Sequence, residues 1–487
     1  MAARHARPRR RRRRARGRGH ARHAARARVR RVRRALAAAL LALACTPRAP
    51  EPLPNVLLVT LDTVRTDHLS LHGYARDTAP SLARVAEQGV RFDLAYAAAS
   101  STLPSHATLF TSLPPRAHGV VKNGLPLAAD LDTLPERLRA RGAQTAAIVS
   151  SFVLDRRFGL DQGFDHYEDD FRAGEGSYVP PGRRWRGFDV GESFDRRANF
   201  TTDRAIAWLD GARDPARPFF LFVHYFDPHD PYDPPEPWKS RFARAPGAAP
   251  SLADALLRRD LVDAYDGEIA FTDAEVGRLL AHLAARGLER DTLVVVTADH
   301  GEGLGQHGVV GHAVNVYEEA VRVPLVLRWP GRLPAGGVVA EPVDATDVLP
   351  TLLELLGLPA APDDAGRSLA CAARGERCLD AEHAVFTHRR PYEKPAVEDG
   401  MRVHGELFAV RRGRWKWIEG DLDGTRELYD LVEDPHERAN VATRESARAE
   451  ALSNAIREHR AAHPARATAA EIAPDDRERL RALGYAD

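Results

Sequence analysis

The first 44 residues contain no aspartate or glutamate, although they contain 17 arginines. The formal net charge of the whole chain is +2, so the rest of the chain carries −15 once these arginines are set aside. Positive charge confined to one terminus argues against a basic nucleic-acid-binding face on the folded body. An acidic body repels nucleic acid at long range, and nucleic acid is therefore not an expected partner.

No long apolar run follows the arginines. The segment ALAAALLALA at residues 35–44 has ten apolar residues, whereas a membrane-spanning helix needs about 20. A positive region, a short apolar region and small residues before Cys45 are typical of a secretory signal peptide. We therefore expect a signal peptide at residues 1–45 and a spacer at residues 46–53, with a nucleic-acid-binding arm as the alternative.

The same segment resembles a bacterial lipoprotein signal, in which the cysteine after the cleavage site is lipidated. Ala42 stands where that family prefers leucine, and Leu43 follows it. A plain signal peptide is the alternative. Either signal predicts a bacterial protein exported to the periplasm, and the lipoprotein signal also predicts lipid on Cys45 as its membrane attachment.

Cysteine is scarce, with three residues in the chain. If Cys45 is the anchor, Cys371 and Cys378 remain as a pair separated by seven residues. In an exported chain such a pair predicts a local disulfide. If the protein is not exported, two free thiols are expected.

Apolar runs of strand length alternate with helical patterns. The runs are NVLLVTLD, TAAIVSS, PFFLFVHYF, TLVVVTAD and VPLVLRW. Such runs are typical of strands buried on both faces, as in a parallel sheet covered by helices. Helical patterns lie at residues 78–89 and 261–287, and residues 105–112 are expected to begin another helix.

This alternation predicts the α/β class, with a doubly wound unit over roughly residues 53–345. We assign residues 54–365 to this domain and residues 366–487 to a smaller C-terminal α+β subdomain and tail. The stretch LFAVRRGRWKWIEG in the second part is hairpin-like. The chain has no internal repeat.

Asp62 follows the first apolar run, and Asp299 with His300 follows the run TLVVVTA. Ligands of open α/β sheets bind outside the carboxyl ends of the strands, so these three side chains are expected at one rim. Two carboxylates and an imidazole there could hold a divalent metal. A single aspartate at a strand end is more often a turn former or helix cap.

Several blocks occur in order between Pro54 and Ala442 and together resemble the sulfatase family of the alkaline phosphatase superfamily. They are NVLLVTLDTVRTDHLSLHGY, APSLARVAEQGVRF, LPSHATLFTSLPPRAHGV, PFFLFVHYFDPHDPYDPP, LVVVTADHGEGLGQHG, YEEAVRVPLVLRWPG and ELYDLVEDPHERANVA. The resemblance implies an alkaline phosphatase-like α/β/α sandwich and a metal-dependent ester hydrolase.

The chain departs from the sulfatase pattern at several functional positions. Thr102 stands where the family has the cysteine or serine that becomes formylglycine, and threonine has no route to that residue. Thr63 replaces a calcium-binding aspartate, and residues 149–152 replace the Gly-Lys-x-His block. His300 stands where the family has asparagine, and His312 where it has lysine.

These departures resemble the threonine enzymes of the same superfamily, in which a threonine attacks phosphorus beside a metal. That resemblance implies one divalent ion held by Asp62, Asp299 and His300, with Thr102 as a metal-activated nucleophile. A metal would lower the pKa of the hydroxyl, which is otherwise a weak nucleophile. The imidazole ligand favours Mn or Zn, and Ca is possible. A helix cap is the alternative role of Thr102.

Further histidines are candidates for the reaction itself. His229, in DPHDP, matches a substrate-contacting histidine of the family, or it is a turn residue. His312 and His307 are flanked by glycine and could act as leaving-group acid, oxyanion donor or ligand of a second metal. No motif for a second metal is visible, and we predict a single ion.

Three other residues are candidates for binding the anion of the substrate. His106 contacts phosphate or packs locally, and Lys122 with its neighbour Asn123 could contact the anion. The helix begun by SHATLFTS would direct free N–H groups at the same anion.

The sequence thus predicts a hydrolase or transferase that cleaves phosphate monoesters or diesters, or sulfate esters, of a small molecule or the cell envelope. Two alternatives stay open. One is an arylsulfatase-like sulfuric ester hydrolase that works without formylglycine. The other is a catalytically inactive binding lipoprotein that keeps the fold.

Overall fold

The structure is a computed structural model that describes residues 53–171, 174–176, 184–185, 188–189, 194–243, 259–398, 400–467 and 472–482. The expected signal peptide with Cys45, and the spacer apart from Leu53, lie outside the described residues. Leu53–Asp487 form one compact unit. In the ranges just given, no helix is both long and apolar enough to cross a membrane.

In the described part of the chain, nine strands form one mixed sheet in the order β12-β2-β11-β8-β1-β7-β3-β4, with β13 beside β2. They are β1 (Asn55–Leu61), β2 (Val90–Tyr96), β3 (Gln144–Ile148), β4 (His166–Glu168), β7 (Phe219–Tyr225), β8 (Thr292–Ala298), β11 (Arg322–Arg328), β12 (Gly337–Val339) and β13 (Val343–Asp344). Every residue of β1, β3, β7 and β8 is buried. The continuous apolar runs therefore mark strands covered on both faces, as expected.

The expected parallel arrangement is correct for β1, which pairs in parallel with β7 and β8, and wrong for β11. Strand β11 runs antiparallel to both β8 and β2. The chain between Ala298 and Arg322 stays at one rim of the sheet and contains no crossover helix, only the four-residue α9 (Glu318–Val321). A parallel strand after β8 would need a crossover connection to the opposite rim. The expectation was wrong because an apolar run carries no signal of strand direction.

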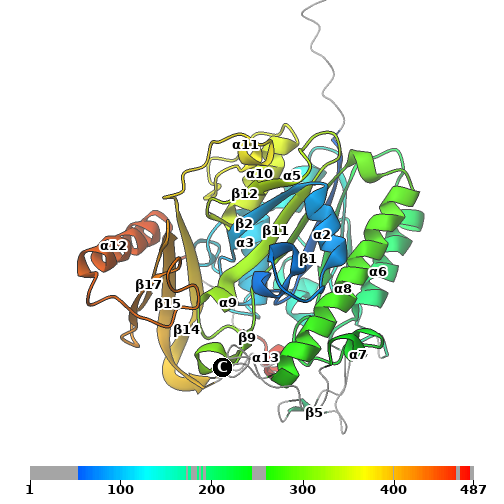
Figure 1. Ribbon diagram of the computed structural model, residues 1–487. Helices are drawn as coiled ribbons and strands as arrows, with labels where there is room; N and C mark the ends of the chain where they lie inside the picture. Colours follow the sequence, from blue (N-terminus) through cyan, green and yellow to red (C-terminus); the bar gives the residue numbers. More distant parts are fainter. Residues whose placement is uncertain are drawn as a thin grey trace, which may run out of the picture. The chain divides into compact units, whose positions relative to one another are not determined.

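Helices cover both faces of the sheet (Figure 1). Helices α2, α6 and α7 each contact α8, while α3 contacts α4, α5 and α10, and α10 contacts α11. Their bounds are α2 (Pro80–Glu87), α3 (Thr102–Thr111), α4 (Pro115–His118), α5 (Leu134–Arg139), α6 (Ala198–Ala207), α7 (Trp238–Phe242), α8 (Arg259–Ala285), α10 (Val348–Leu355) and α11 (Ala370–Ala373). The structure confirms an α/β/α arrangement.

Helix α3 begins at Thr102, three residues earlier than the expected start at Ser105. All ten of its residues are buried. Pro104 sits in the first turn, where its missing N–H costs no hydrogen bond. The early start matters because it puts Thr102 itself in the first turn of the helix.

The C-terminal part is an antiparallel sheet of β14 (Ala384–Glu398), β15 (Met401–Arg412), β16 (Trp415–Gly420) and β17 (Arg426–Asp430), followed by α12 (Ser446–Ala462). Side chains of β15 alternate between two cores. Phe408 and Val410 pack with Leu452 of α12, whereas Leu407 and Ala409 belong to another core that includes residues at the edge of the α/β unit. The expected α+β subdomain, with its hairpin at β15–β16, is confirmed.

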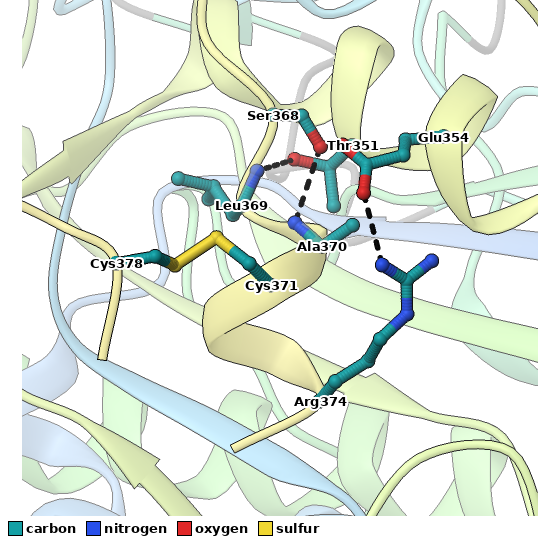
Figure 2. The surroundings of a disulfide bond; sticks show 8 residues. All are labelled: Thr351, Glu354, Ser368, Leu369, Ala370, Cys371, Arg374 and Cys378. Carbon is teal, nitrogen blue, oxygen red and sulfur yellow. Dashed lines mark hydrogen bonds and ion pairs between the residues drawn. A yellow bond between two sulfur atoms is a disulfide. The ribbon is translucent and has the colours of Figure 1, made fainter. Parts of the chain in front are cut away.

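The expected disulfide between Cys371 and Cys378 is present (Figure 2). Cys371 lies in α11, and the neighbouring backbone is held by a hydrogen bond from the Leu369 N–H to Thr351 Oγ1 (2.8 Å). Leu369 belongs to the same hydrophobic core as the large sheet. Helix α11 thus packs with the α/β part, although it lies after the predicted boundary between residues 365 and 366. That boundary stays a prediction.

Near the C-terminus, α13 (Pro474–Ala482) returns to the α/β part. Ile472 and Leu480 join the large hydrophobic core beside Gly124, and Arg157 forms an ion pair with Asp476 (2.5 Å). This tail therefore packs beside the loop that contains Lys122 and Asn123. The remaining short strand pairs are β5 (Arg184–Trp185) with β6 (Phe188–Asp189), and β9 (Gly303–Leu304) with β10 (Val310–Gly311).

Candidate active site and metal site

Asp62 and Asp299 lie at the same rim of the sheet because they follow neighbouring parallel strands. The last residues of β1 and β8, Leu61 and Ala298, are in register. Among the described residues, Asp62, Asp299 and His300 form a group whose ligand atoms all lie within 4.8 Å of one another. We call these three residues the DDH cluster. All three side chains are fully buried.

Each carboxylate of the DDH cluster has one oxygen that is hydrogen-bonded and one that is not. Asp62 Oδ2 lies 3.1 Å from Nε2 of His224, while Asp299 Oδ1 accepts the N–H groups of Thr63 and His300 (3.2 and 2.8 Å). Asp62 Oδ1 and Asp299 Oδ2 are buried and accept no hydrogen bond. A buried carboxylate oxygen without a donor is costly unless a cation occupies the space it faces. The residues present therefore fit a divalent metal ion.

His300 completes the cluster on the side of Thr102. Its Nδ1 lies 3.0 Å from the Gly301 carbonyl oxygen and donates to it, which orients Nε2. Nε2 lies 3.2 Å from Thr102 Oγ1, 3.4 Å from Asp299 Oδ2 and 3.9 Å from Asp62 Oδ1. A backbone acceptor behind a ligating imidazole is the usual way to fix its orientation.

Charges inside the cluster are strongly coupled. Burial raises the pKa of Asp62 well above its usual value, and the charge of Asp299 raises it further. Burial also acts against the charge of Asp299, but His300, with smaller contributions from neighbouring histidines and the Thr63 N–H, outweighs it and lowers the pKa of that carboxyl. Burial likewise opposes a charged His300, and Asp299 and Asp62 overcome it and raise its pKa. A buried cation would be stabilised by the same carboxylates.

Thr63 occupies the place of the family's calcium-binding aspartate and has a different part in this chain. Its hydroxyl donates to the Pro228 carbonyl oxygen (2.8 Å), and its N–H donates to Asp299 (3.2 Å). Its φ of 57° lies in the left-handed region, which non-glycine residues rarely adopt. Thr63 thus holds Asp299 in place and supplies no carboxylate.

Thr102 lies where the first turn of α3 presents its N–H groups. The Asn123 Oδ1 accepts the Leu103 N–H (2.9 Å), while the Asn123 Nδ2 is buried and makes no hydrogen bond. The structure thus brings Asn123 next to Thr102. An amide donor and a helix N-terminus together suit an anion bound at Thr102. Lys122, the preceding residue, is partly exposed.

His312 and His229 lie beside the DDH cluster. The ring centroid of His312 is 4.6 Å from that of His300 and 4.8 Å from that of His229. His312 Nδ1 lies 3.2 Å from Glu302 Oε1. This carboxylate stabilises a protonated imidazole, as is required of an acid that protonates a leaving group.

His229 is held between an aromatic ring and a backbone acceptor. Its ring stacks on Phe226 at 4.3 Å, and its Nδ1 lies 2.6 Å from the Asp230 carbonyl oxygen. Burial lowers the pKa of His229 to about 4. With Nδ1–H bonded to a carbonyl, the neutral ring presents Nε2 as an acceptor, which suits contact with a hydroxyl group.

Two of the expected substrate-binding histidines already have partners on both ring nitrogens. His106 Nδ1 donates to the Thr102 carbonyl oxygen (2.8 Å), and its Nε2 bonds to Thr60 Oγ1 (2.9 Å). His307 stacks on Tyr317 at 3.8 Å and bonds to Glu319 (2.7 Å) and to the backbone of Glu437 (3.1 Å). His106 therefore supports the first turn of α3, and His307 holds its loop to the C-terminal part.

Sequence reasoning missed His224 and Glu302, and it left Asn123 among minor candidates. His224 lies in β7 and pairs in register with Thr60 of β1, so it stands beside Asp62. A histidine inside the apolar run FFLFVHY was the available signal, because a buried polar side chain needs a partner. Glu302 directly follows the block DHG and had no separate signal.

The fold and this cluster fit one class of protein, the ester hydrolases built on an α/β/α sandwich with carboxylate and histidine side chains that could hold a metal. Comparison with known proteins gives the family. The family described as Sulfatase matches residues 54–358, and the family described as N-sulphoglucosamine sulphohydrolase, C-terminal, matches residues 305–462. The chain belongs to the sulfatase family.

Individual relatives differ in the chemistry of their substrates. The N-acetylglucosamine-6-O-sulfatase of Bacteroides thetaiotaomicron is 25% identical, with 83% of this chain and 86% of the relative covered. The multifunctional alkaline phosphatase superfamily protein PehA of Trinickia caryophylli is 28% identical, with 80% and 91% covered. The crystal structure of the phosphonate monoester hydrolase of Agrobacterium radiobacter superimposes with a TM-score of 0.68 at 25% identity, over 84% of this chain and 96% of that one.

Proposed function

We propose that this enzyme cleaves phosphate esters, or sulfate esters, with Thr102 as the covalent nucleophile and one divalent ion held by the DDH cluster. The proposal rests on one observation, the 3.2 Å contact between Thr102 Oγ1 and His300 Nε2. Beside this contact lie two carboxylate oxygens that accept no hydrogen bond. When bound there, a metal ion would lower the pKa of the threonine hydroxyl and neutralise charge on the transferring group. Mn or Zn is favoured, and Ca is possible.

The chain's own groups account for the proton and bond changes. Thr102 Oγ1 gives its proton to water and forms a bond to phosphorus or sulfur, while the bond from that atom to the ester oxygen breaks. His312 gives a proton to the departing oxygen, with Glu302 stabilising the charged imidazole. Water or an acceptor alcohol then gives a proton to His312 and attacks the phosphorus or sulfur atom carried by Thr102. The bond from that atom to Thr102 Oγ1 breaks, and Oγ1 takes a proton from water, which gives hydrolysis or transfer respectively.

Donors around Thr102 would hold the anion during these steps. The first turn of α3 and the Asn123 Nδ2 supply N–H groups, and Lys122 would add positive charge. Donors fixed by a buried helix stabilise charge that develops on the equatorial oxygens without reorganising. His229 Nε2 would accept a hydrogen bond from the attacking or departing hydroxyl.

Threonine at position 102 favours phosphoryl transfer over the formylglycine chemistry of sulfatases. The hydrate of an aldehyde such as formylglycine carries a second hydroxyl group that can expel sulfate. The Cβ of threonine carries a single oxygen, so a threonine ester cannot lose the anion in this way. The group attached to Thr102 must be removed by direct attack on phosphorus or sulfur. The similarity to a phosphonate monoester hydrolase and to PehA supports esters of phosphorus as substrates. The sulfatase relatives support sulfate esters.

Export is proposed on separate grounds. The disulfide Cys371–Cys378 is stable in oxidising compartments and rare in reducing ones. Together with the signal predicted at residues 1–45, it supports a periplasmic or lipid-anchored bacterial enzyme whose substrates are imported esters or components of the envelope.

A panel of substrates tests the proposal. Aryl phosphate, bis-aryl phosphate, aryl phosphonate and aryl sulfate are assayed with Mn²⁺, Zn²⁺ or Ca²⁺ on the wild type, Thr102→Ala and Thr102→Ser. We expect metal-dependent turnover of phosphate esters that Thr102→Ala abolishes and Thr102→Ser retains in part. Intact-mass spectrometry of a quenched reaction should show a phosphoryl adduct on the wild type.

Three outcomes would contradict parts of the proposal. Turnover of aryl sulfate alone would refute the preference for phosphorus. Activity unchanged in Thr102→Ala would refute the nucleophile. No metal-dependent turnover of any ester would indicate a binding protein that keeps the sulfatase fold.

A further inference from the structure

Thr63, the residue that directly follows Asp62, has a backbone conformation that its residue type disfavours. Its φ of 57° lies in the left-handed region, where a β-branched side chain is rare. Thr63 is fully buried, so its hydrogen bonds must come from the protein and not from water. Strain of this kind persists only where the surrounding structure holds the backbone in place.

The conformation of Thr63 sets the direction of its N–H group. This N–H donates to Asp299 Oδ1 (3.2 Å), and the other carboxylate oxygen, Asp299 Oδ2, accepts no hydrogen bond and is left for a cation. A change of φ at Thr63 would turn the peptide group between Asp62 and Thr63 relative to the rest of the loop. The N–H would then no longer point at Asp299, and that carboxylate would lose the donor that orients it.

Tyr265 of α8 bonds to both sides of this turn, although 202 positions separate it from Thr63 in the chain. Its hydroxyl donates to the Thr63 carbonyl oxygen (2.6 Å) and accepts the Arg65 N–H (3.0 Å). A phenol has one hydrogen to donate, so the bond to Thr63 uses it. Burial raises the pKa of Tyr265 well above its usual value, and the phenol therefore keeps this hydrogen.

The ring of Tyr265 is itself held in place. It is fully buried and meets the rings of His68 and Tyr232 edge-on, with centroids 5.2 and 5.5 Å away. The next residue of α8, Asp266, has its Oδ1 2.7 Å from the Nδ1 of His68. Helix α8 is thus joined to the segment after β1 at two consecutive residues. Packing therefore determines where the Tyr265 hydroxyl lies, independently of the turn that it contacts.

We propose that Tyr265 is a positioning residue for the metal site: its hydroxyl holds Thr63 in the left-handed conformation, and Thr63 in turn orients the carboxylate of Asp299. This inference rests on the proposed function, in which the DDH cluster holds a divalent ion. The Thr63 hydroxyl adds a second restraint, since it lies 2.8 Å from the carbonyl oxygens of both Asp62 and Pro228. Together the two restraints keep a threonine in a conformation that glycine adopts without strain.

Calorimetric titration of metal-free protein with Mn²⁺ or Zn²⁺ tests this role without reference to catalysis. We expect Tyr265→Phe, which keeps the ring and removes the hydroxyl, to lower the affinity by about tenfold or more. Tyr225→Phe is the matched control, because Tyr225 is equally buried and its hydroxyl bonds to Thr202 of α6 (2.8 Å). This control should keep the wild-type affinity. Equal affinities for Tyr265→Phe and the wild type would overturn the inference.

A second substitution shows whether Tyr265 acts through Thr63. Thr63→Gly removes the strain, because glycine adopts a positive φ readily. We expect the addition of Tyr265→Phe to Thr63→Gly to change the affinity by less than about threefold, since residues that act on one backbone turn are not additive. The same loss in both backgrounds would mean that Tyr265 supports the fold without orienting Thr63, which would also overturn the inference.

Thr63→Val tests the same turn with Tyr265 intact. Valine keeps the branched shape and loses the hydroxyl bond to the Pro228 carbonyl oxygen, so we expect severalfold weaker metal binding. Wild-type affinity in this variant would show that the conformation of the turn does not govern the site. Failure of the proposed function is distinguishable. A wild type that binds no divalent ion would overturn the metal site and this inference together, whereas tight binding by the wild type and Tyr265→Phe alike would overturn this inference alone.

Discussion

The Nε2 of His224 lies 3.1 Å from the Asp62 Oδ2, although 162 positions separate the two residues in the chain. The His224 Nδ1 faces the Ser150 N–H (3.4 Å) and accepts from it, so Nε2 carries the hydrogen and donates to Asp62. Burial lowers the pKa of His224 to about 4, which keeps its imidazole ring neutral. His224 thus occupies one oxygen of Asp62 and leaves the other for a cation.

Loss of this bond should weaken metal binding. We expect His224→Leu to lower the affinity for Mn²⁺ or Zn²⁺ by about 10- to 100-fold, the usual effect of removing such an outer partner. His224→Gln, which keeps a donor near the position of Nε2, should recover most of the affinity. Calorimetric titration of metal-free protein measures both, and equal affinities for His224→Leu and the wild type would contradict the assignment.

His312 should matter most when the leaving group is poor. Removing a general acid costs typically 10²- to 10⁴-fold when the departing oxygen needs a proton. We expect His312→Gln to slow alkyl phosphates by about that factor and to change 4-nitrophenyl phosphate little, because nitrophenolate leaves without a proton. The dependence of kcat/KM on leaving-group pKa should therefore be steeper in the variant. The same slope in both proteins would remove His312 from this role.

Acid should destabilise the fold through buried neutral histidines, of which His118 is an example away from the DDH cluster. Its Nδ1 accepts the Val120 N–H (3.1 Å), its Nε2 bonds to Thr108 Oγ1 (3.1 Å), and burial lowers its pKa from 6.5 to about 3. The unfolded chain therefore binds one more proton than the folded chain between pH 6.5 and about 3. Stability from this group is complete above pH 6.5 and falls as pH decreases through that window, by up to about 1.4 kcal/mol per pH unit.

His118→Asn, whose carbonyl can still accept the Val120 N–H, should remove this contribution. The free energy of unfolding is measured with urea from pH 7 to 4.5. We expect it to fall less steeply with decreasing pH in His118→Asn than in the wild type. The two slopes should differ by about 1.4 kcal/mol per pH unit, which corresponds to one proton. The exposed His436→Asn is the matched control and should keep the wild-type slope. Parallel curves for His118→Asn and the wild type would contradict the prediction.

The disulfide should stabilise the protein measurably. Cys371 and Cys378 close a short loop against the large core, so Cys371→Ser with Cys378→Ser should lower the free energy of unfolding by about 2–3 kcal/mol. Dithiothreitol should lower the urea midpoint of the wild type and leave that of the double variant unchanged. A wild-type midpoint that does not respond to reductant would refute a structural role.

By itself, the sequence determined five strands of the large sheet (β1, β3, β7, β8 and β11), the three helices α2, α3 and α8, and the rim at which Asp62, Asp299 and His300 meet. Apolar runs of strand length that end in charged residues carry this information locally, because parallel strands bring their carboxyl ends to one edge. The family resemblance added Thr102, and the spacing of Cys371 and Cys378 predicted their bond. The direction of β11 had no local signal, since an apolar run reads the same in either direction.

Only the tertiary structure decided which polar atoms are already used. His106 and His307 resemble site residues in the sequence, yet both ring nitrogens of each have partners, whereas His224 resembles a core residue and supports Asp62. Hydrogen bonds between residues far apart in the chain distribute donors and acceptors, and no local pattern encodes that distribution.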